Sequence, residues 1–360
     1  MMSQRTVGDV LDTLAAEGLL DQENQARAAE VLEQNIVATP WYLRFMVGFG
    51  AWWAALFFMG FFSLLTHSRP AALFSGVVLV VGAILVRRLQ RGDFLNQLAL
   101  AASLAGQLLV LFGSDIKSAT GAALLVLMMQ GFLIVFYADQ THRLLSTLVA
   151  VGAIEVLLFE WKWTYGTAVL AGLLGIVSIR LWLKETVFVG LGLERLMRPV
   201  AYGLVLALFG LLLPSIFPPF FDAHNPLMLH VRYLWLSTAL LGAGLLYLVH
   251  VLLAERGLPP FGAFALFSYG AVLLLMWPAE RAPGLIGALI VLLLGFRRGN
   301  RLLLGMALLF LAVFLSAYYY NLSISLLMKS VALAGSGVVL LALRWVLIKQ
   351  LPEGEANHAH

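Results

Sequence analysis

The chain contains no cysteine and few charged residues, and both absences narrow what it can be. Without cysteine, disulfide bonds, thiolate metal sites and cysteine nucleophiles are all excluded. Lysine, arginine, aspartate and glutamate make up only 12% of the 360 residues, whereas a soluble domain usually carries about 25%. Hydrophobic residues reach 61%. The composition therefore predicts a protein whose main solvent is lipid.

The sequence also lacks the short motifs of several enzyme classes. It has no Gly-x-x-x-x-Gly-Lys-Ser/Thr loop, no Gly-x-Ser-x-Gly elbow and no His-Glu-x-x-His helix. The histidines are dispersed, and His224 and His230 have no third ligand nearby in the sequence. Ser325 and Lys329 are one helical turn apart, but such a pair is more typical of an ordinary helix than of a nucleophile. We therefore expect no enzymatic activity, no metal, no cofactor and no nucleic-acid binding.

Apolar runs that suit membrane helices recur along the chain. A hydrocarbon core of about 30 Å needs about 20 helical residues. The runs predict an all-α, polytopic transmembrane helix bundle of about 12 spans. Counts of 10 or 11 stay open because several runs, above all Gly284–Phe296, are short. The predicted spans are Phe45–Leu65, Ala71–Val86, Leu95–Phe112, Gly121–Tyr137, Leu144–Phe159, Gly166–Leu183, Val200–Leu213, Tyr233–Leu253, Phe261–Trp277, Gly284–Phe296, Leu302–Ala317 and Leu322–Leu347.

Polar segments flank the predicted bundle of residues 41–350. Residues 1–40 hold two arginines and seven carboxylates, a net charge of −5, and their apolar residues recur at three- and four-residue spacing. This pattern predicts a short amphipathic helical hairpin in the cytoplasm. Its role is open between a solvated appendage and a docking site for a partner. Residues 351–360 are predicted to form a polar tail.

The basic residues predict an orientation in the membrane. If the spans alternate from a cytoplasmic N-terminus, cytoplasmic segments receive 17 of the 23 lysines and arginines. Cytoplasmic loops carry such an excess in membrane proteins. Most of the nine tryptophans also fall at predicted span ends, where their rings favour the interface. We therefore expect both termini in the cytoplasm.

Small residues four positions apart occur inside three predicted spans. Helices in lipid approach closely where such residues lie in the contact. The spacing therefore favours a packed bundle. The pairs are Ala102 with Gly106, Ala171 with Gly175, and Thr238 with Gly242.

A few polar side chains fall inside the predicted spans, where a functional role is the default hypothesis. Glu155 lies six residues before Trp161 and therefore about 9 Å below the outer surface. Lys329 has a similar depth in the last span, so the two are predicted to share an ion pair or hydrogen-bond network. Two alternatives stay open: Lys329 extends to the outer headgroups, and Glu155 only stabilises the bundle. The candidate functional cluster comprises Glu155, Lys329, Gln107, Gln130, Asn321 and Tyr320.

The stretch from about Arg297 to Arg344 carries a recognisable pattern. It reads Arg298, Asn300-Arg301, Leu303-Leu304-Gly305, Phe314-Leu315, Tyr318-Tyr319-Tyr320, Leu322, Leu326-Leu327, Lys329-Ser330, Leu333, Gly335 and Leu340-Leu341. This pattern resembles the uncharacterised bacterial membrane family catalogued as domain of unknown function 4401. It is also similar to the related family numbered 2157.

The resemblance implies a multi-pass protein of the bacterial inner membrane with no established activity and no catalytic residues to carry over. Such proteins often accompany a small membrane-anchored protein with a Gly-Asp-Tyr-x-x-Leu-x-Tyr motif, which this chain lacks. We therefore expect a non-enzymatic component that acts with such a partner. The alternative is a transporter or lipid-handling protein with a polar cavity that opens outward near Glu155 and Lys329.

Overall fold

The computed structural model describes residues 68–89, 93–216, 234–280 and 282–321, together with isolated positions nearer each terminus. All regular secondary structure in these residues is helical. Eight of the described helices are long and apolar enough to cross a membrane, judged by length and composition. The chain divides into two compact units, Met1–Asp115 and Ile116–His360.

The first unit contains two tightly packed helices, α4 (Arg69–Arg88) and α5 (Asp93–Gly113). Glycine lets their backbones touch: a Cβ atom on Gly76 would lie 2.7 Å from the carbonyl oxygen of Gly106. No side chain fits at that distance, so both glycines are needed for the contact. Gly106 is one of the small residues that the spacing singled out, and it lies in this helix contact.

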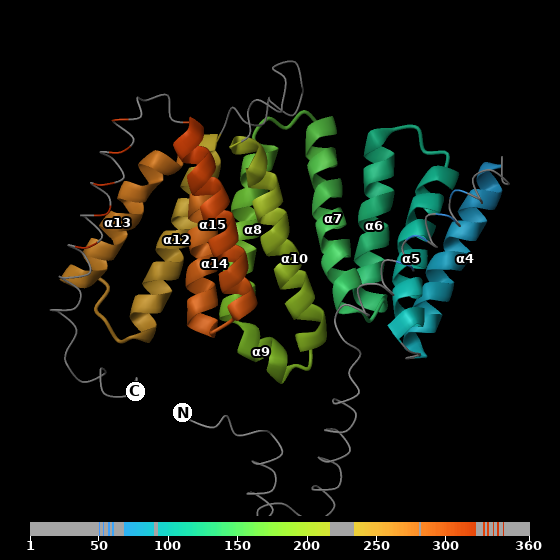
Figure 1. Cartoon of the computed structure of the whole chain (residues 1–360), viewed down its shortest axis with the longest axis horizontal. Helices are drawn as coiled ribbons and strands as arrows, with labels where there is room; N and C mark the ends of the chain where they lie inside the picture. The colour runs from blue at the N-terminus through green and yellow to red at the C-terminus, as the bar shows by residue number, and fades with distance from the viewer. Residues whose placement is uncertain are drawn as a thin grey trace, which may run out of the picture. The chain divides into compact units, whose positions relative to one another are not determined.

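The second unit is a bundle of helices, and each of its long helices overlaps a predicted span. Short turns join most of them, and Figure 1 shows α7, α8, α10, α12 and α14 running side by side. The helices are α6 (Ala119–Phe136), α7 (Gln140–Glu160), α8 (Gly166–Leu183), α9 (Glu185–Gly190), α10 (Glu194–Leu212), α12 (Leu234–Glu255), α13 (Ala263–Ala279), α14 (Gly284–Arg298) and α15 (Arg301–Asn321), with the 3₁₀ turn η1 (Leu213–Ser215) after α10.

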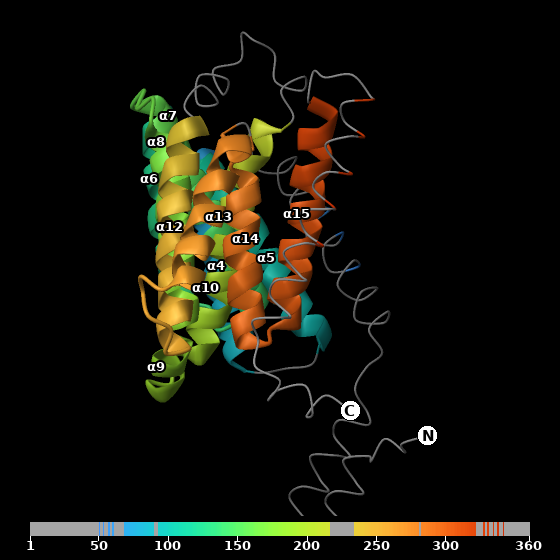
Figure 2. The ribbon, with the colours of Figure 1, turned by 90° about the vertical axis from the view of Figure 1, so that its left-hand side faces the viewer.

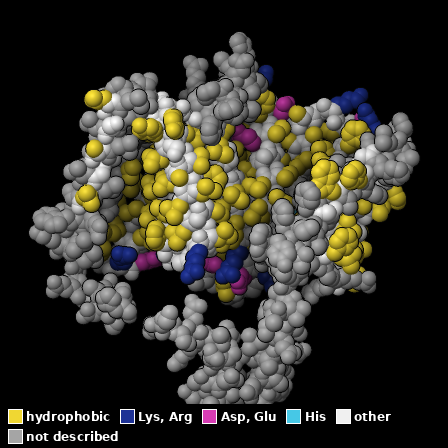
Figure 3. Space-filling view, in the orientation of Figure 1, with side chains coloured by type: hydrophobic (Ala, Val, Ile, Leu, Met, Phe, Trp, Pro, Cys, Tyr) yellow, Lys and Arg dark blue, Asp and Glu magenta, His cyan; other side chains and the backbone are white. Residues whose placement is uncertain are grey.

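Successive long helices of the second unit run in opposite directions and define two ends. At one end α6, α8, α12 and α14 finish and α7, α10, α13 and α15 begin; we call it the arginine-rich end. Figure 3 shows basic and acidic side chains along the lower edge of a broad hydrophobic surface. Among the described residues of the second unit, the only lysines or arginines at the opposite end are Lys117 and Lys162. The arginine-rich end carries Arg143, Arg180, Lys184, Arg195, Arg198, Arg256, Arg297, Arg298 and Arg301.

Helix α14, the shortest predicted span, occupies the centre of the second unit. Its 15 residues extend for about 22 Å, less than the thickness of a hydrocarbon core. Ile290, Val291 and Leu294 are 0% exposed, and the helix packs against α8, α10, α12, α13 and α15. Figure 2 shows α13, α14 and α15 side by side. A helix that is apolar on all sides is typical of such a buried position.

Close apolar packing holds the opposite end of the second unit together. A Cβ atom on Gly284, the first residue of α14, would lie 2.2 Å from the ring of Phe314 in α15. One turn away, Phe310 stacks on Phe209 of α10, with ring centroids 4.1 Å apart. The α14–α15 pair therefore depends on a glycine at this position.

Several predictions concern residues outside the described ranges. They are the hairpin of residues 1–40, the first span 45–65, the last span 322–347 and the tail 351–360. The isolated positions described within the two spans are helical. The count of about 12 spans therefore stays a prediction.

Candidate functional site

A tight turn between α14 and α15 fixes two polar side chains at the arginine-rich end. Gly299 ends α14 with a φ of 61°, a left-handed conformation that glycine adopts without strain. The amide of Asn300 then donates to the carbonyl of Gly295 at 3.0 Å. The Asn300 side-chain oxygen accepts from the amide of Leu303 at 3.1 Å and so caps the start of α15. Arg298 and Asn300 are thereby held on either side of the turn.

Arg298 ties α14 to the last turn of α8. Its Nε donates to the carbonyl of Trp182 and its Nη2 to the carbonyl of Leu183, both at 2.8 Å. The last carbonyls of a helix have no partner within the helix, and a cation there also meets the negative end of the helix dipole. The Arg298 side chain is only 17% exposed, so this is a largely buried contact.

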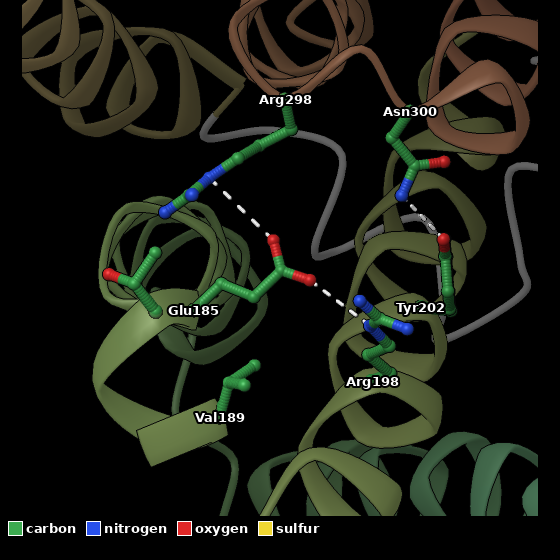
Figure 4. A pocket seen from close by; sticks show the side chains of 7 residues that line it. Glu185, Val189, Arg198, Tyr202, Arg298 and Asn300 are labelled. Atoms are coloured by element: carbon green, nitrogen blue, oxygen red, sulfur yellow. Dashed lines mark hydrogen bonds and ion pairs between the residues drawn. The ribbon is translucent and has the colours of Figure 1, made fainter. Parts of the chain in front are cut away.

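Glu185, the first residue of α9, lies between two guanidinium groups. Its Oε1 accepts from Nε of Arg198 at 3.1 Å, and its Oε2 lies 3.6 Å from Nε of Arg298. Figure 4 shows the carboxylate between the two arginines. Glu185 is 18% exposed and Arg198 is 52% exposed. The carboxylate thus orients one largely buried arginine and one that is open to solvent.

Helix α10 contributes the remaining polar side chains of this region. Nη1 of Arg198 lies 2.5 Å from Oε1 of Glu194, one turn earlier. One turn later, the Tyr202 hydroxyl accepts from Nδ2 of Asn300 at 2.6 Å. The Tyr202 ring meets the edge of Trp182 with centroids 5.0 Å apart. Three helices and the α14–α15 turn therefore meet at one place.

An open pocket of about 540 Å³ lies at this meeting point. Figure 4 shows it from close by, with the Glu185 bridge and the Asn300–Tyr202 bond. Its charged lining side chains are two arginines and one glutamate, and Glu194, outside the lining, pairs with Arg198. The lining residues are Glu185, Thr186, Val189, Arg198, Tyr202, Arg298 and Asn300.

A second arginine at the same end is also used to join helices. Arg143 is 9% exposed; its Nε donates to the carbonyl of Ile134 at 2.9 Å and its Nη1 to the carbonyl of Arg195 at 2.8 Å. It therefore connects the end of α6 and the start of α10 to its own helix, α7. From the sequence, Arg143 counted only among the basic residues at predicted cytoplasmic span ends.

Glu155 lies toward the opposite end of the second unit. It accepts a hydrogen bond from the hydroxyl of Thr167, in the first turn of α8. Its second oxygen, Oε2, is buried and has no hydrogen-bond partner among the described residues. Lys329 lies outside the described residues, so the predicted Glu155–Lys329 interaction stays a prediction.

The other predicted cluster members lie in separate places. Gln107 belongs to the first unit, where it donates to the Ser103 hydroxyl at 3.3 Å. In the second unit, Gln130 is 1% exposed within α6, and Tyr320 is 79% exposed. Asn321 donates to the carbonyl of Ile216 at 2.8 Å and so ties α15 to the end of η1. In the described part of the chain, no group of three or more His, Asp or Glu residues is placed to hold a metal ion.

The sequence did not predict this pocket, because its residues are separated in the chain and are of types common at span ends. Arg298 and Asn300 lie about 100 residues after Glu185 and Arg198 in the chain, and arginines near span ends were interpreted only as orientation signals. One sequence feature could have indicated it: Glu185 follows Lys184 directly at a predicted cytoplasmic span end. Asn300 was noted only as part of the C-terminal pattern, and Arg298 only in that pattern and among the basic residues of the predicted cytoplasmic side.

A family model described as "Domain of unknown function (DUF4401)" matches residues 40–350. This match covers every described helix and the pocket, and it confirms the resemblance seen in the C-terminal pattern. No curated protein and no solved structure matches the chain.

Proposed function

The chain belongs to the DUF4401 family, and we propose that it is a non-enzymatic component of the bacterial inner membrane that acts with a small membrane-anchored partner. The described helices support the membrane setting, because eight of them have the length and composition of spans. The bacterial inner membrane and the partner come from the family resemblance.

The observation that carries the proposal is the use of polar side chains as ties between helices. Arg143 and Arg298 donate to the carbonyls of neighbouring helices. Thr238 of α12 donates to the carbonyl of Ala279 in α13 at 2.8 Å. A catalytic site would need such groups to converge on a reacting atom instead. Groups that fix helices in place favour a scaffold that presents a surface.

The segment around α9 supplies a surface suited to a partner. Helix α9 has six residues and lies between the long helices α8 and α10. Its apolar side chains are exposed, and exposed apolar patches mark interaction sites. An apolar segment of the small partner, next to its membrane anchor, would cover them. This α9 patch consists of Val187 (55% exposed), Val189 (45%), Leu191 (65%) and Leu193 (41%).

The test is co-purification from native membranes with a Leu191→Asn/Leu193→Asn double variant. We expect a stoichiometric small protein with the Gly-Asp-Tyr-x-x-Leu-x-Tyr motif to accompany the wild type and to be lost from the variant. Phe261→Asn is the matched control, because Phe261 is 83% exposed in the α12–α13 connection at the same end. Equal recovery with both variants, or no such protein with the wild type, contradicts the proposal.

One observation favours the alternative, a transporter or lipid-handling protein with a cavity near Glu155. The buried Oε2 of Glu155 has no partner in the described residues, and a buried carboxylate oxygen without a partner calls for a water, an ion or a ligand. Because the chain has no cysteine, a Thr167→Cys variant carries a single thiol beside Glu155. Reaction of that thiol with a small water-soluble reagent would support the cavity, and complete protection would oppose it.

A further inference from the structure

We propose that the pocket between α9, α10 and the α14–α15 turn binds a phosphate-bearing anion, either a lipid headgroup or free phosphate. Nothing in the family description assigns a ligand to this pocket. The inference goes beyond the proposed role with a partner and does not depend on it.

The two arginines keep donors that the described contacts do not use. A guanidinium carries five N–H donors in a planar fork. Arg298 uses Nε and Nη2 on the α8 carbonyls, and Arg198 uses Nε and Nη1 on Glu185 and Glu194. Nη1 of Arg298 and Nη2 of Arg198 remain for a ligand. The Tyr202 hydroxyl accepts from Asn300, so its own proton is also available to donate.

The charge of the pocket favours an anion over a cation. Glu185 is the one acidic residue among the seven lining residues, and both of its oxygens face arginines. A cation would have to displace those arginines, whereas an anion meets guanidinium donors, although Glu194 also pairs with Arg198 from outside the lining. The surrounding end adds further lysines and arginines, which raise the local concentration of anions.

The geometry fits a phosphate group in particular. Arginine matches phosphate oxygens with parallel N–H donors, and the bonds are strengthened by charge. Here Glu185 holds one guanidinium on each side (Figure 4), so the donors are oriented before a ligand arrives. Basic pockets between membrane helices bind phosphate headgroups in this way. The open pocket of about 540 Å³ lies within the size range of small-ligand sites.

The experiment measures binding to the purified full chain in a neutral detergent. Three probes are titrated separately: inorganic phosphate, a short-chain phosphatidylglycerol and a short-chain diacylglycerol that lacks phosphate. We expect binding of one or both phosphate probes and none of the diacylglycerol. Tighter binding of phosphatidylglycerol than of phosphate identifies a lipid headgroup as the source, and the reverse order identifies free phosphate.

Variants separate the pocket from general charge. Arg198 is 52% exposed and lies outside the helix-capping contacts, so Arg198→Gln should fold and weaken phosphate binding about tenfold. Arg198→Lys keeps the charge and should retain part of the affinity. Arg256→Gln removes an equal charge from an exposed position outside the pocket at the same end and should leave binding unchanged.

A Glu185→Gln variant should change the phosphate affinity in the opposite direction to Arg198→Gln. It removes the negative charge that competes with phosphate for the two arginines, and the glutamine side-chain oxygen can still accept from Arg198 and keep it oriented. Phosphate should therefore bind more tightly than in the wild type, with melting recorded to verify folding. Three results would overturn the proposal: no binding of either phosphate probe, equal losses with Arg198→Gln and Arg256→Gln, or diacylglycerol binding equal to that of phosphatidylglycerol.

Discussion

At both ends of the second unit, side chains donate hydrogen bonds to backbone carbonyls of neighbouring helices, but the two ends use different side chains. At the arginine-rich end, Arg143 and Arg298 donate to the last carbonyls of α6 and α8. At the opposite end, Thr238 and Asn321 donate to carbonyls at the ends of α13 and η1. The acceptors are backbone carbonyls at both ends, but the donors are charged at one end and neutral at the other.

This difference shows that a charge bias along a membrane chain need not concern orientation alone. Arg143 and Arg298 count toward the 17 basic residues on the predicted cytoplasmic side, yet each also fastens two helices. A charged donor with five N–H groups can fasten a helix and still have donors left over. A threonine hydroxyl has one proton to donate. Ligand binding is therefore expected at the arginine-rich end.

The largest effect is expected from Arg298→Gln. The change removes two charge-assisted bonds to the Trp182 and Leu183 carbonyls and leaves Glu185 facing one arginine, so the free energy of unfolding should fall by about 3 kcal/mol. Thermal melting in detergent measures the change. Arg256→Gln is the control, because Arg256 is exposed at the same end and an exposed charge contributes about 1 kcal/mol or less. Equal losses for the two variants would contradict a special role for Arg298.

A smaller effect is expected from Thr238→Val at the neutral end. Valine has the shape of threonine but cannot donate to the Ala279 carbonyl, so the loss should be about 1 kcal/mol. The same melting assay checks it, and Thr238→Ser should retain most of the stability because it keeps the hydroxyl. A loss as large as that of Arg298→Gln would remove the contrast between the ends.

The smallest effect concerns Glu155 and Lys329, whose predicted interaction lies partly outside the described residues. In a double-mutant cycle with Glu155→Gln and Lys329→Met, the two changes should be non-additive by at least about 0.5 kcal/mol, because each removes the other's partner. Melting of the two single variants and the double variant supplies the cycle. Additive shifts would leave Glu155 with Thr167 alone and Lys329 as an interfacial anchor.

Much of the helical arrangement could be predicted from apolar runs. The run Gly166–Leu183 coincides with α8, because lipid-facing and core-facing positions in a membrane helix are both apolar. Helix α10 begins at Glu194, six residues before the predicted Val200, since its first turns carry charges and Pro199. Helix α9 was not predicted, because six residues are too few to show a period.

The site was harder to predict than the fold. Polar residues inside spans drew attention because burying them in lipid is costly, and Glu155 does have an orphan oxygen. The pocket instead joins residues as far apart as Glu185 and Asn300, which only the packing of α8, α10 and α14 brings together. No spacing rule along a single chain connects such segments.

The most direct test asks whether the arginine-rich end faces the cytoplasm, and it uses the absence of cysteine. Single replacements Arg256→Cys and Lys162→Cys place one thiol at the arginine-rich end and one at the opposite end, both at exposed positions. In intact cells, a membrane-impermeant thiol reagent should label Lys162→Cys and should label Arg256→Cys only after the membrane is permeabilised. Labelling of Arg256→Cys in intact cells, with Lys162→Cys protected, would place the arginine-rich end outside and contradict the account.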